Sequence, residues 1–400
     1  MTDTVMPIQA LTNPPSSVGT ADTEAGRVDT ASVLAELRTH LDRDRQTNLG
    51  FPSTFAFDYT PLLPLFNYVL NNVGDPFQES AFPANTKHLE RQVLAWFAAL
   101  LRAPEAWWGV CTDGGTQGIE YGLLHARTRY PDGVVLHSAQ AHYSVAKVAA
   151  KLAMPTAVIN AHPDGQMDYH HLAKVVRTHR RRPIIVVAAI GTTMTEAIDD
   201  VATIRTILAD NQVTRAYVHG DEALSGLHLA VSPPQQRPRF DLADGIDSLS
   251  ISAHKFLGCP FPAGIYLTTQ PSAAGSRVDY IATTDTTVTG SRSGHAPLLI
   301  WYALHTYGIE GLRHRAEQAR RTAMYAVQRL HAIGWPAWRY PHALTVVLGT
   351  PPAEIRTRWR LATSGRLSHL ITMPGITNAQ IDMLAAEIEA HTNTAPEGPP

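Results

Sequence analysis

The sequence predicts an α/β fold with a mostly parallel central sheet covered by helices on both faces, followed by a smaller α+β domain. Apolar strand-like runs alternate with amphipathic helical segments through most of the chain, which is the order that builds a parallel sheet. From about residue 300 the pattern changes to a long helix followed by short strands. At 400 residues the chain also exceeds the usual size of one domain.

The predicted elements begin with a helix over 29–45, capped by Asp29 or Thr30. It follows a leader rich in Thr, Ser, Ala and Pro, which is expected to be disordered because it lacks periodicity. Further helices are expected over 86–101, 115–129, 143–152, 169–180 and 200–211. Strands are expected over 133–137, 156–160, 183–190, 215–219 and 246–251.

The second part of the chain starts with a long helix that contains Trp301 and Tyr302. Short strands are expected over 344–348 and 368–373, and a last amphipathic helix over 378–389. The predicted organisation is a leader, an N-terminal segment, a large cofactor-binding domain, a small C-terminal domain and a tail, over 1–27, 28–75, 76–298, 299–391 and 392–400.

The composition narrows the function classes. The net charge of −2 gives no general electrostatic reason to expect nucleic-acid binding. No apolar run reaches the length of a membrane span, and the first residues lack the pattern of a secretory signal. Two cysteines, Cys111 and Cys259, make no disulfide framework and fit a reducing compartment. We therefore expect a cytoplasmic protein that binds neither membrane nor nucleic acid.

The most informative stretch is Ser252-Ala253-His254-Lys255, which lies between an apolar run and a Gly- and Pro-rich turn. A lysine held there is a candidate for a pKa lowered by desolvation, and so for an imine with a carbonyl cofactor. Asp221, 34 positions earlier (255 − 221), ends another apolar run. A lysine that holds an aldehyde, with a carboxylate that keeps a pyridine nitrogen protonated, is the pair that pyridoxal 5'-phosphate (PLP) requires.

Several other polar groups follow predicted strands. Residues 112–118, Thr-Asp-Gly-Gly-Thr-Gln-Gly, open a helix and suit a phosphate, although taken alone they fit an ordinary glycine-rich turn with a Thr cap better. His142 lies between a strand and a helix, where it would either stack on a flat ring or bond backbone. Gly191-Thr192-Thr193, Asp221 and Lys255 each follow a strand, so they are expected to meet at one rim of the sheet.

A metal site is a competing hypothesis, because His219, Asp221, Glu222 and His228 are close in sequence. Residues two apart on a strand share a face, which would join His219 and Asp221. Neither an H-E-x-x-H nor a C-x-x-C spacing is present. We therefore predict no metal, and keep a metal-dependent hydrolase as an alternative that the colour of the purified protein would exclude.

The ordered motifs carry a family resemblance that extends from about residue 48 to 388. They are residues 113–118, 141–144 (Ala-His-Tyr-Ser), 191–193, 219–221 (His-Gly-Asp) and 252–255. In this order they resemble group II PLP-dependent amino-acid decarboxylases, in particular bacterial histidine decarboxylases and the related plant serine decarboxylases. The resemblance implies a type I PLP-enzyme fold and a homodimer with active sites at the interface.

The resemblance also implies roles for individual residues. Lys255 would bind the cofactor as an imine, Asp221 would pair with its pyridinium nitrogen and His142 would stack on its ring. Thr193 would line the ring, and Arg292 would reach the site of a neighbouring subunit. The proton donor to the α-carbon would be His142 or Tyr280, the latter on a mobile loop over about 270–288. The phosphate would be held by Gly115, Thr116, Ser252 and His254.

Two departures from the family bear on the substrate. Residues 74–80 read Gly-Asp-Pro-Phe-Gln-Glu-Ser, nearer the serine-decarboxylase pattern, and Glu222 stands where a small residue is usual. Glu222 would recognise a cationic side chain or point away from the site. Phe77 would line an apolar pocket or belong to the core. We predict conversion of L-histidine to histamine, with serine, valine or leucine as alternative substrates and an aldehyde-forming PLP reaction as an alternative chemistry.

Overall fold

The computed structural model describes residues 29–271 and 275–394. The chain divides into two compact units, Met1–Gln46 and Thr47–Pro400. The described part of the first unit, 29–46, holds all but the last residue of helix α1 (Thr30–Thr47), whose start is capped by the carboxylate of Asp29 accepting the amide of Ala31 at 3.1 Å. The predicted leader over 1–27 lies outside the described residues.

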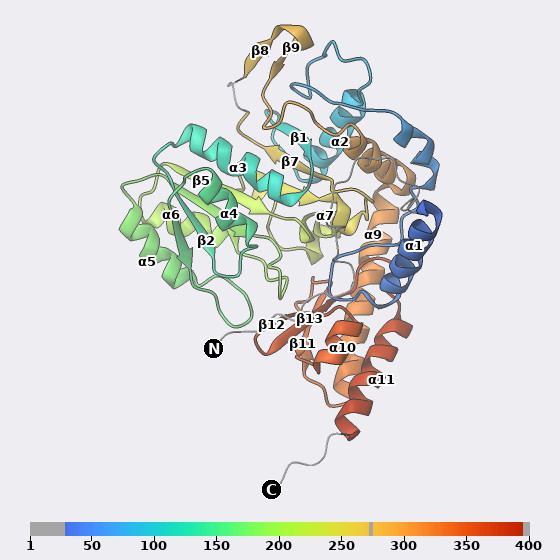
Figure 1. Ribbon diagram of the computed structural model, residues 1–400. Helices are drawn as coiled ribbons and strands as arrows, with labels where there is room; N and C mark the ends of the chain where they lie inside the picture. The colour runs from blue at the N-terminus through green and yellow to red at the C-terminus, as the bar shows by residue number, and fades with distance from the viewer. Residues whose placement is uncertain (1–28, 272–274, 395–400) are drawn as a thin grey trace, which may run out of the picture. The chain divides into compact units, whose positions relative to one another are not determined.

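The second unit contains a seven-stranded sheet that is parallel over most of its width (Figure 1). Neighbouring strands from β3 through β2, β4 and β5 to β6 run parallel, whereas β7 is antiparallel to both β6 and β1. The mostly parallel sheet predicted from the sequence is therefore confirmed. In spatial order the strands are β1 (Trp108–Thr112), β7 (Gly264–Thr268), β6 (Ser248–Ser252), β5 (Ala216–Asp221), β4 (Ile184–Ala189), β2 (Val134–Ser138) and β3 (Thr156–Ile159).

Helices cover both faces of this sheet, which explains why a central strand such as β4 is apolar along its whole length. On one face α3 (Gly115–Arg129) and α4 (Ser144–Lys151) pack on side chains such as Ile185 and Tyr217. On the other face α5 (Tyr169–His179) and α6 (Val201–Asp210) pack on alternate side chains of the same strands, such as Ile184 and Val218. Helix α2 (Lys87–Leu100) packs on β1 and on α9 (His295–Ala332).

Three predicted regions differ from the structure. The antiparallel strands β1 and β7 were not expected, because their short segments carry little apolar periodicity and become strands by pairing with each other. The segment expected to be a mobile loop, over about 270–288, contains a hairpin of β8 (Ser276–Val278) and β9 (Thr283–Asp285), joined through the short helix η4 (Asp279–Ile281).

The C-terminal part is α+β, as predicted. Helix α9 is kinked at Gly308, whose φ of 59° lies in the left-handed region that glycine adopts readily. A four-stranded antiparallel sheet follows, and α11 continues beyond the expected end at 389. Its strands and helices are β10 (Ala337–Trp338), β11 (Thr345–Gly349), β13 (Leu367–Ile371), β12 (Ala362–Ser364), α10 (Ala353–Arg358) and α11 (Asn378–Thr394). The domain boundaries at 75/76 and 298/299 stay predictions.

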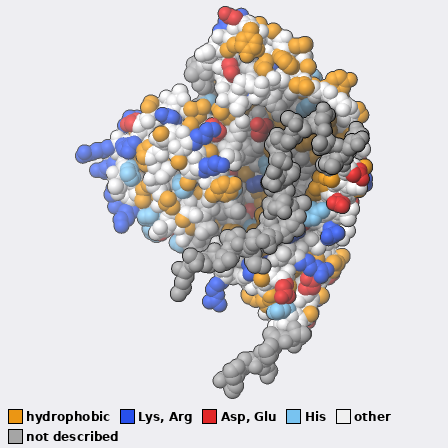
Figure 2. Space-filling view, viewed as in Figure 1, with side chains coloured by type: hydrophobic (Ala, Val, Ile, Leu, Met, Phe, Trp, Pro, Cys, Tyr) orange, Lys and Arg blue, Asp and Glu red, His pale blue; other side chains and the backbone are white. Residues whose placement is uncertain are grey.

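Side chains of two kinds gather at separate places on the face drawn in Figure 2. Figure 2 shows Lys and Arg side chains on the side of the molecule where α5 lies, and hydrophobic side chains over the β8–β9 hairpin. The basic run from Arg180 to Arg182 directly follows α5, and its first two residues are exposed, as expected of a solvated helix end. None of the helices in the described ranges is long and apolar enough to cross a membrane.

Candidate active site

A cavity of about 720 Å³ opens where the parallel strands end. Its lining comes from the start of α3, the loops after β2 and β4, the end of β5, helix α8 (Ala253–Phe256) and strand β13. The segment Gly50–Pro52 closes another side. Carboxyl ends of parallel strands are the usual ligand-binding edge of such a sheet. Eight of the predicted site residues line this cavity: Gly115, Thr116, His142, Thr193, Asp221, Ser252, His254 and Lys255.

The first feature of the cavity is a cradle at the N-terminus of α3. Gly114 has a φ of +113°, and a Cβ there would lie 2.8 Å from the His254 ring. The amide of Gly115 donates to the Ser252 hydroxyl at 2.9 Å, and a Cβ at Gly115 would lie 2.9 Å from that oxygen. The two glycines therefore bring backbone N–H groups close to polar side chains at a helix N-terminus, where an anion is favoured.

Asp221 ends β5 inside the cavity and is 8% exposed. Its Oδ1 atom has no hydrogen-bond partner within the described part of the chain. Burial raises the pKa of Asp221, whereas the nearby Lys255 and His142 act in the opposite direction. An unpartnered buried carboxylate oxygen facing a cavity is suited to a cationic N–H group of a ligand.

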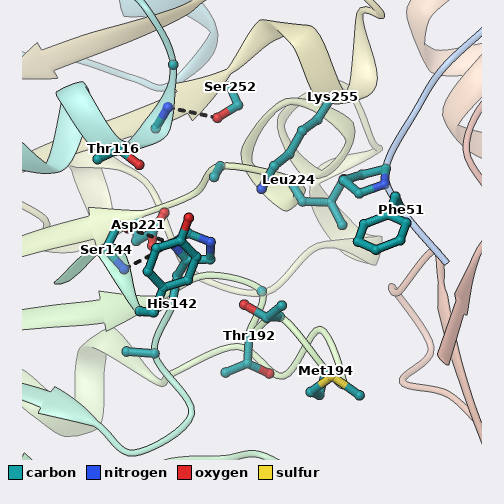
Figure 3. Close-up of a pocket in the computed structure, with 18 of the residues that line it drawn as sticks. Phe51, Thr116, His142, Ser144, Thr192, Met194, Asp221, Leu224, Ser252 and Lys255 are labelled. Atoms are coloured by element: carbon teal, nitrogen blue, oxygen red, sulfur yellow. Dashed lines mark hydrogen bonds between the residues drawn. The ribbon is translucent and has the colours of Figure 1, made fainter. Parts of the chain in front are cut away.

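Lys255 enters the same cavity from α8, directly after β6 (Figure 3). Burial lowers the pKa of Lys255, while the carboxylates of Asp221 and Glu196 act the other way. A lysine with a lowered pKa has a larger neutral fraction near pH 7, and the neutral amine is the nucleophile that attacks an aldehyde. In Figure 3 the amine of Lys255 points into the cavity, toward the side where His142 and Asp221 lie.

His142 follows β2 and is oriented by Ser144. The Nδ1 atom of His142 lies 2.6 Å from the Ser144 hydroxyl and accepts the Ser144 backbone amide at 3.3 Å. Because a backbone N–H only donates, Nδ1 is the acceptor and the neutral ring carries its proton on Nε2. Burial lowers the pKa of His142, and Lys255 lowers it further against the effect of Asp221. The geometry therefore holds a neutral imidazole in one tautomer.

Thr193 reaches the cavity from the loop after β4. This loop turns sharply at Gly191, whose φ is +106°, and the Thr192 and Thr195 hydroxyls bond each other at 2.9 Å. The carboxylate of Glu196, at the end of the loop, accepts the amides of Leu344 and Thr345 at 2.9 and 2.8 Å. The loop is thereby attached to the C-terminal sheet.

The structure does not bring four of the predicted site residues to this cavity. Tyr280 lies on η4 between β8 and β9 and is 86% exposed. Phe77 packs edge-on against Trp107, with ring centroids 5.6 Å apart. Both side chains lie at the surface, and neither lines the cavity.

The other two are buried elsewhere. Arg292 forms an ion pair with Glu90 at 2.5 Å and donates to the carbonyl of Gly74 at 3.0 Å. Glu222 points away from Asp221, because successive side chains of an extended segment face opposite sides. Its carboxylate is buried between Gly220 and Gly226, where a Cβ on either glycine would lie 2.8 Å from a carboxylate oxygen. Neither of its oxygens has a partner among the described residues, and burial raises the pKa of Glu222 well above its ordinary value.

The histidines of the alternative metal site have other partners. His219 bonds the Ser248 hydroxyl at 2.8 Å, and His228 bonds the Glu196 carboxylate at 2.9 Å. Over 29–271 and 275–394, no three His, Cys, Asp or Glu side chains converge as metal ligands would. The Lys255 and Asp221 side chains share one cavity instead.

Some residues of the cavity were not expected from the sequence. Ser144 and His369 act on it through hydrogen bonds, and Phe51, Met194 and Leu224 supply apolar surface. A serine two positions after His142 at a helix start was the one signal available for Ser144. Met194 and Leu224 lie close in sequence to the predicted Thr193 and Asp221, whereas Phe51 and His369 come from segments whose approach depends on tertiary packing.

Known proteins of one family are similar to this chain over most of its length. The family described as "Pyridoxal-dependent decarboxylase conserved domain" matches residues 71–334. The histidine decarboxylase of Mesorhizobium japonicum is 41% identical over 360 residues, which cover 89% of this chain and 96% of the relative. That of Pseudomonas fluorescens is 40% identical over 374 residues, covering 90% and 91%.

Solved structures show the same fold. L-methionine decarboxylase from Streptomyces sp. 590 superposes with a TM-score of 0.81 at 26% identity, covering 92% of this chain and 97% of that one. Glutamate decarboxylase from Lactobacillus brevis superposes with a TM-score of 0.76 over 96% and 97% of the chains, at 16% identity, which bears on the fold alone.

Proposed function

The chain belongs to the family of pyridoxal-dependent decarboxylases, and from this premise we propose that it converts L-histidine to histamine and CO₂. The protein is a PLP-dependent amino-acid decarboxylase by its family. The single observation that carries the choice of histidine is the likeness to histidine decarboxylases at about 40% identity over most of both chains.

The residues of the cavity fit PLP on three structural grounds. The cradle at Gly114 and Gly115 combines a helix N-terminus, small residues and the Ser252 hydroxyl, which suits a phosphate. The free Oδ1 of Asp221 is suited to a protonated pyridine nitrogen. Lys255 supplies a buried amine in the same cavity. When bound, PLP draws electrons from the substrate's α-carbon, which allows the carboxylate to leave as CO₂.

The residues then have the following proposed roles. Lys255 would hold the cofactor through its amine, and Asp221 would keep a positive charge on the pyridine nitrogen. Gly115, Thr116, Ser252 and His254 would hold the phosphate, while Thr193 would line the ring. His142 lines the cavity and would stack on the ring. In its imidazolium form it would be the candidate in this chain for returning a proton to the α-carbon.

We propose that the active form is a homodimer. Support comes from exposed apolar side chains on neighbouring segments of the second unit, including Leu63, Tyr68 and Val69. The Tyr280 hydroxyl, which lies outside this chain's cavity, would take part in proton return only at the cavity of a second copy. A cytoplasmic location is supported by Cys111 and Cys259, which are both free thiols.

One observation favours a second substrate class. Part of the cavity wall is apolar, formed by Phe51, Met194, Leu224 and Ile371. Such a wall suits an aliphatic side chain such as that of valine or leucine. A panel of L-amino acids with amine detection by mass spectrometry distinguishes the two substrate classes. Histamine as the main product supports histidine as the substrate, and an aliphatic amine contradicts this choice. Release of ammonia with an aldehyde, instead of an amine, would indicate the alternative PLP chemistry.

Lys255→Ala tests the cofactor role separately from the substrate. We expect this variant to lose both turnover and the cofactor that borohydride fixes to the wild-type chain. Lys174→Ala, which changes an exposed lysine on α5, is the matched control and should keep both. Turnover in Lys255→Ala at the wild-type rate would contradict the role assigned to Lys255.

A further inference from the structure

His369 connects two walls of the active-site cavity through its two ring nitrogens. It lies on β13, is 2% exposed and lines the cavity. Its Nδ1 atom lies 3.1 Å from the carbonyl oxygen of Met194, and its Nε2 atom lies 3.0 Å from that of Gly50. These carbonyls belong to segments more than a hundred residues apart in the chain, so the ring of His369 bridges them in space.

Both bridged segments belong to the part of the cavity where a substrate side chain would lie. Met194 follows Thr193, which we place beside the cofactor ring, and Gly50 precedes Phe51, which lines the cavity. Figure 3 shows Met194 and Phe51 on the side of the cavity away from Asp221 and His142, with Leu224 between Lys255 and Phe51. A change in either bond of His369 would therefore alter the width of the cavity at its apolar wall.

The protonation state of the His369 ring decides whether both contacts are hydrogen bonds. Carbonyl oxygens only accept hydrogen bonds, and a neutral imidazole has a single N–H to donate. Both contacts are hydrogen bonds only when both nitrogens carry a proton. In the neutral ring, one nitrogen lone pair faces a carbonyl oxygen at about 3 Å in a buried place, which is unfavourable.

The surroundings of His369 shift its pKa in opposite directions. Burial lowers the pKa of His369, whereas its two carbonyl partners and the carboxylate of Glu196 act to raise it. The same carboxylate also acts on the buried His228 and on three half-buried groups, namely His342, Arg320 and Arg339. Across the cavity, the titratable groups are Asp221, Lys255, His142 and His254.

We propose that His369 is a positioning residue that holds the Gly50 and Met194 walls around the substrate when its ring carries two protons, and releases one wall when it carries one. The inference rests on the proposed function, because it assigns this role in binding the amino-acid side chain. Both bonds are present at low pH and one is lost as the pH rises through the pKa of His369. Since burial lowers that pKa, the change lies below the ordinary histidine value of about 6.5.

The test compares the wild-type holoenzyme with His369→Gln between about pH 5 and pH 8, measuring kcat and KM for histidine. The amide of Gln carries both of its N–H groups on one nitrogen, and its oxygen cannot replace the second N–H of the ring, so it does not reproduce both contacts. We expect the variant's KM to exceed that of the wild type on the order of tenfold at the acid end, the difference shrinking as the pH rises, with a much smaller change in kcat. Titration of the substrate's own imidazole is common to both proteins and cancels in this ratio.

His331→Gln is the matched control. The Nε2 of His331 contacts a single carbonyl, that of Ala337 at 2.7 Å, so a neutral ring satisfies it, and His331 does not line the cavity. Its KM ratio to the wild type should stay near one at every pH. A ratio for His369→Gln that does not change with pH, or a loss confined to kcat, would overturn the proposal.

A second measurement needs no variant. L-Histidine methyl ester has no free carboxylate to lose, so its binding to the wild type, followed by cofactor absorbance, reports affinity without turnover. After correction for the ester's own titration, tighter binding at the acid end supports the proposal and equal binding refutes it. If the amino-acid panel identifies another substrate, the proposed function fails, and the same KM comparison with that substrate and its ester still decides the role of His369.

Discussion

Arg292→Met is expected to lower the free energy of unfolding by about 3–4 kcal/mol, because it leaves the buried carboxylate of Glu90 without its cation. The side chains of Arg292 and Glu90 are 5% and 0% exposed, and their charged atoms lie 2.5 Å apart. Breaking a buried pair by removing one partner costs about 3–5 kcal/mol. Glu90 keeps hydrogen bonds from Asn72 and from the amide of Cys111, both at 2.9 Å, which places the expected loss in the lower part of that range.

Urea unfolding of the holoenzyme measures this loss, with Arg277→Met as the control. Arg277 pairs with Asp279 at 3.7 Å, but these side chains are largely exposed, so the control should lose less than about 1 kcal/mol. The double variant Glu90→Gln with Arg292→Met should recover more than half of the unfolding free energy that Arg292→Met alone loses, because no unpaired charge then remains buried.

The same variant separates the two roles considered for Arg292. If Arg292 bound the substrate, Arg292→Met would raise KM strongly while the unfolding free energy changed by less than about 1 kcal/mol. That outcome would refute the reasoning from the ion pair with Glu90. The structural role instead predicts a large loss of stability, with KM changed only as far as the fold is disturbed.

Three further changes test other parts of the site. Asp221→Asn should keep PLP bound but lower kcat by about 10²–10³, since a neutral amide does not hold a positive charge on the pyridine nitrogen; equal rates would contradict this. Ser144→Ala removes the hydroxyl that bonds Nδ1 of His142, so kcat/KM should fall about tenfold. Unchanged kinetics would show that the hydroxyl is not required to hold the tautomer of His142. Glu222→Met removes an unpartnered buried carboxyl and should stabilise the fold by about 1–3 kcal/mol in thermal or urea unfolding. Because burial raises the folded-state pKa of Glu222, the contribution of Glu222 to stability falls as the pH rises above its unfolded pKa of about 4.3. Glu222→Met should make this decline of the unfolding free energy with pH less steep. A decline as steep as in the wild type would show that Glu222 does not cause it.

The sequence alone predicted the class of fold, the cofactor and eight of the residues that line the cavity. Lys255, Asp221 and Thr193 each follow a strand, and parallel strands bring their carboxyl ends to one edge, so local order was enough to gather them. The start of α3 was predictable for a similar reason, because its glycines and its position after a strand are visible in the sequence. The family comparisons confirm the fold, the enzyme class and the cofactor.

Only the tertiary structure decided which charged and aromatic side chains stay away from the cavity. Arg292 pairs with Glu90, 202 positions earlier, and Tyr280 is carried to the surface by the β8–β9 hairpin. His369 meets Gly50 across 319 positions. Such contacts arise from the packing of distant segments against one another. A linear pattern records which residues alternate or repeat, but not which distant backbone carbonyl or carboxylate a side chain will meet.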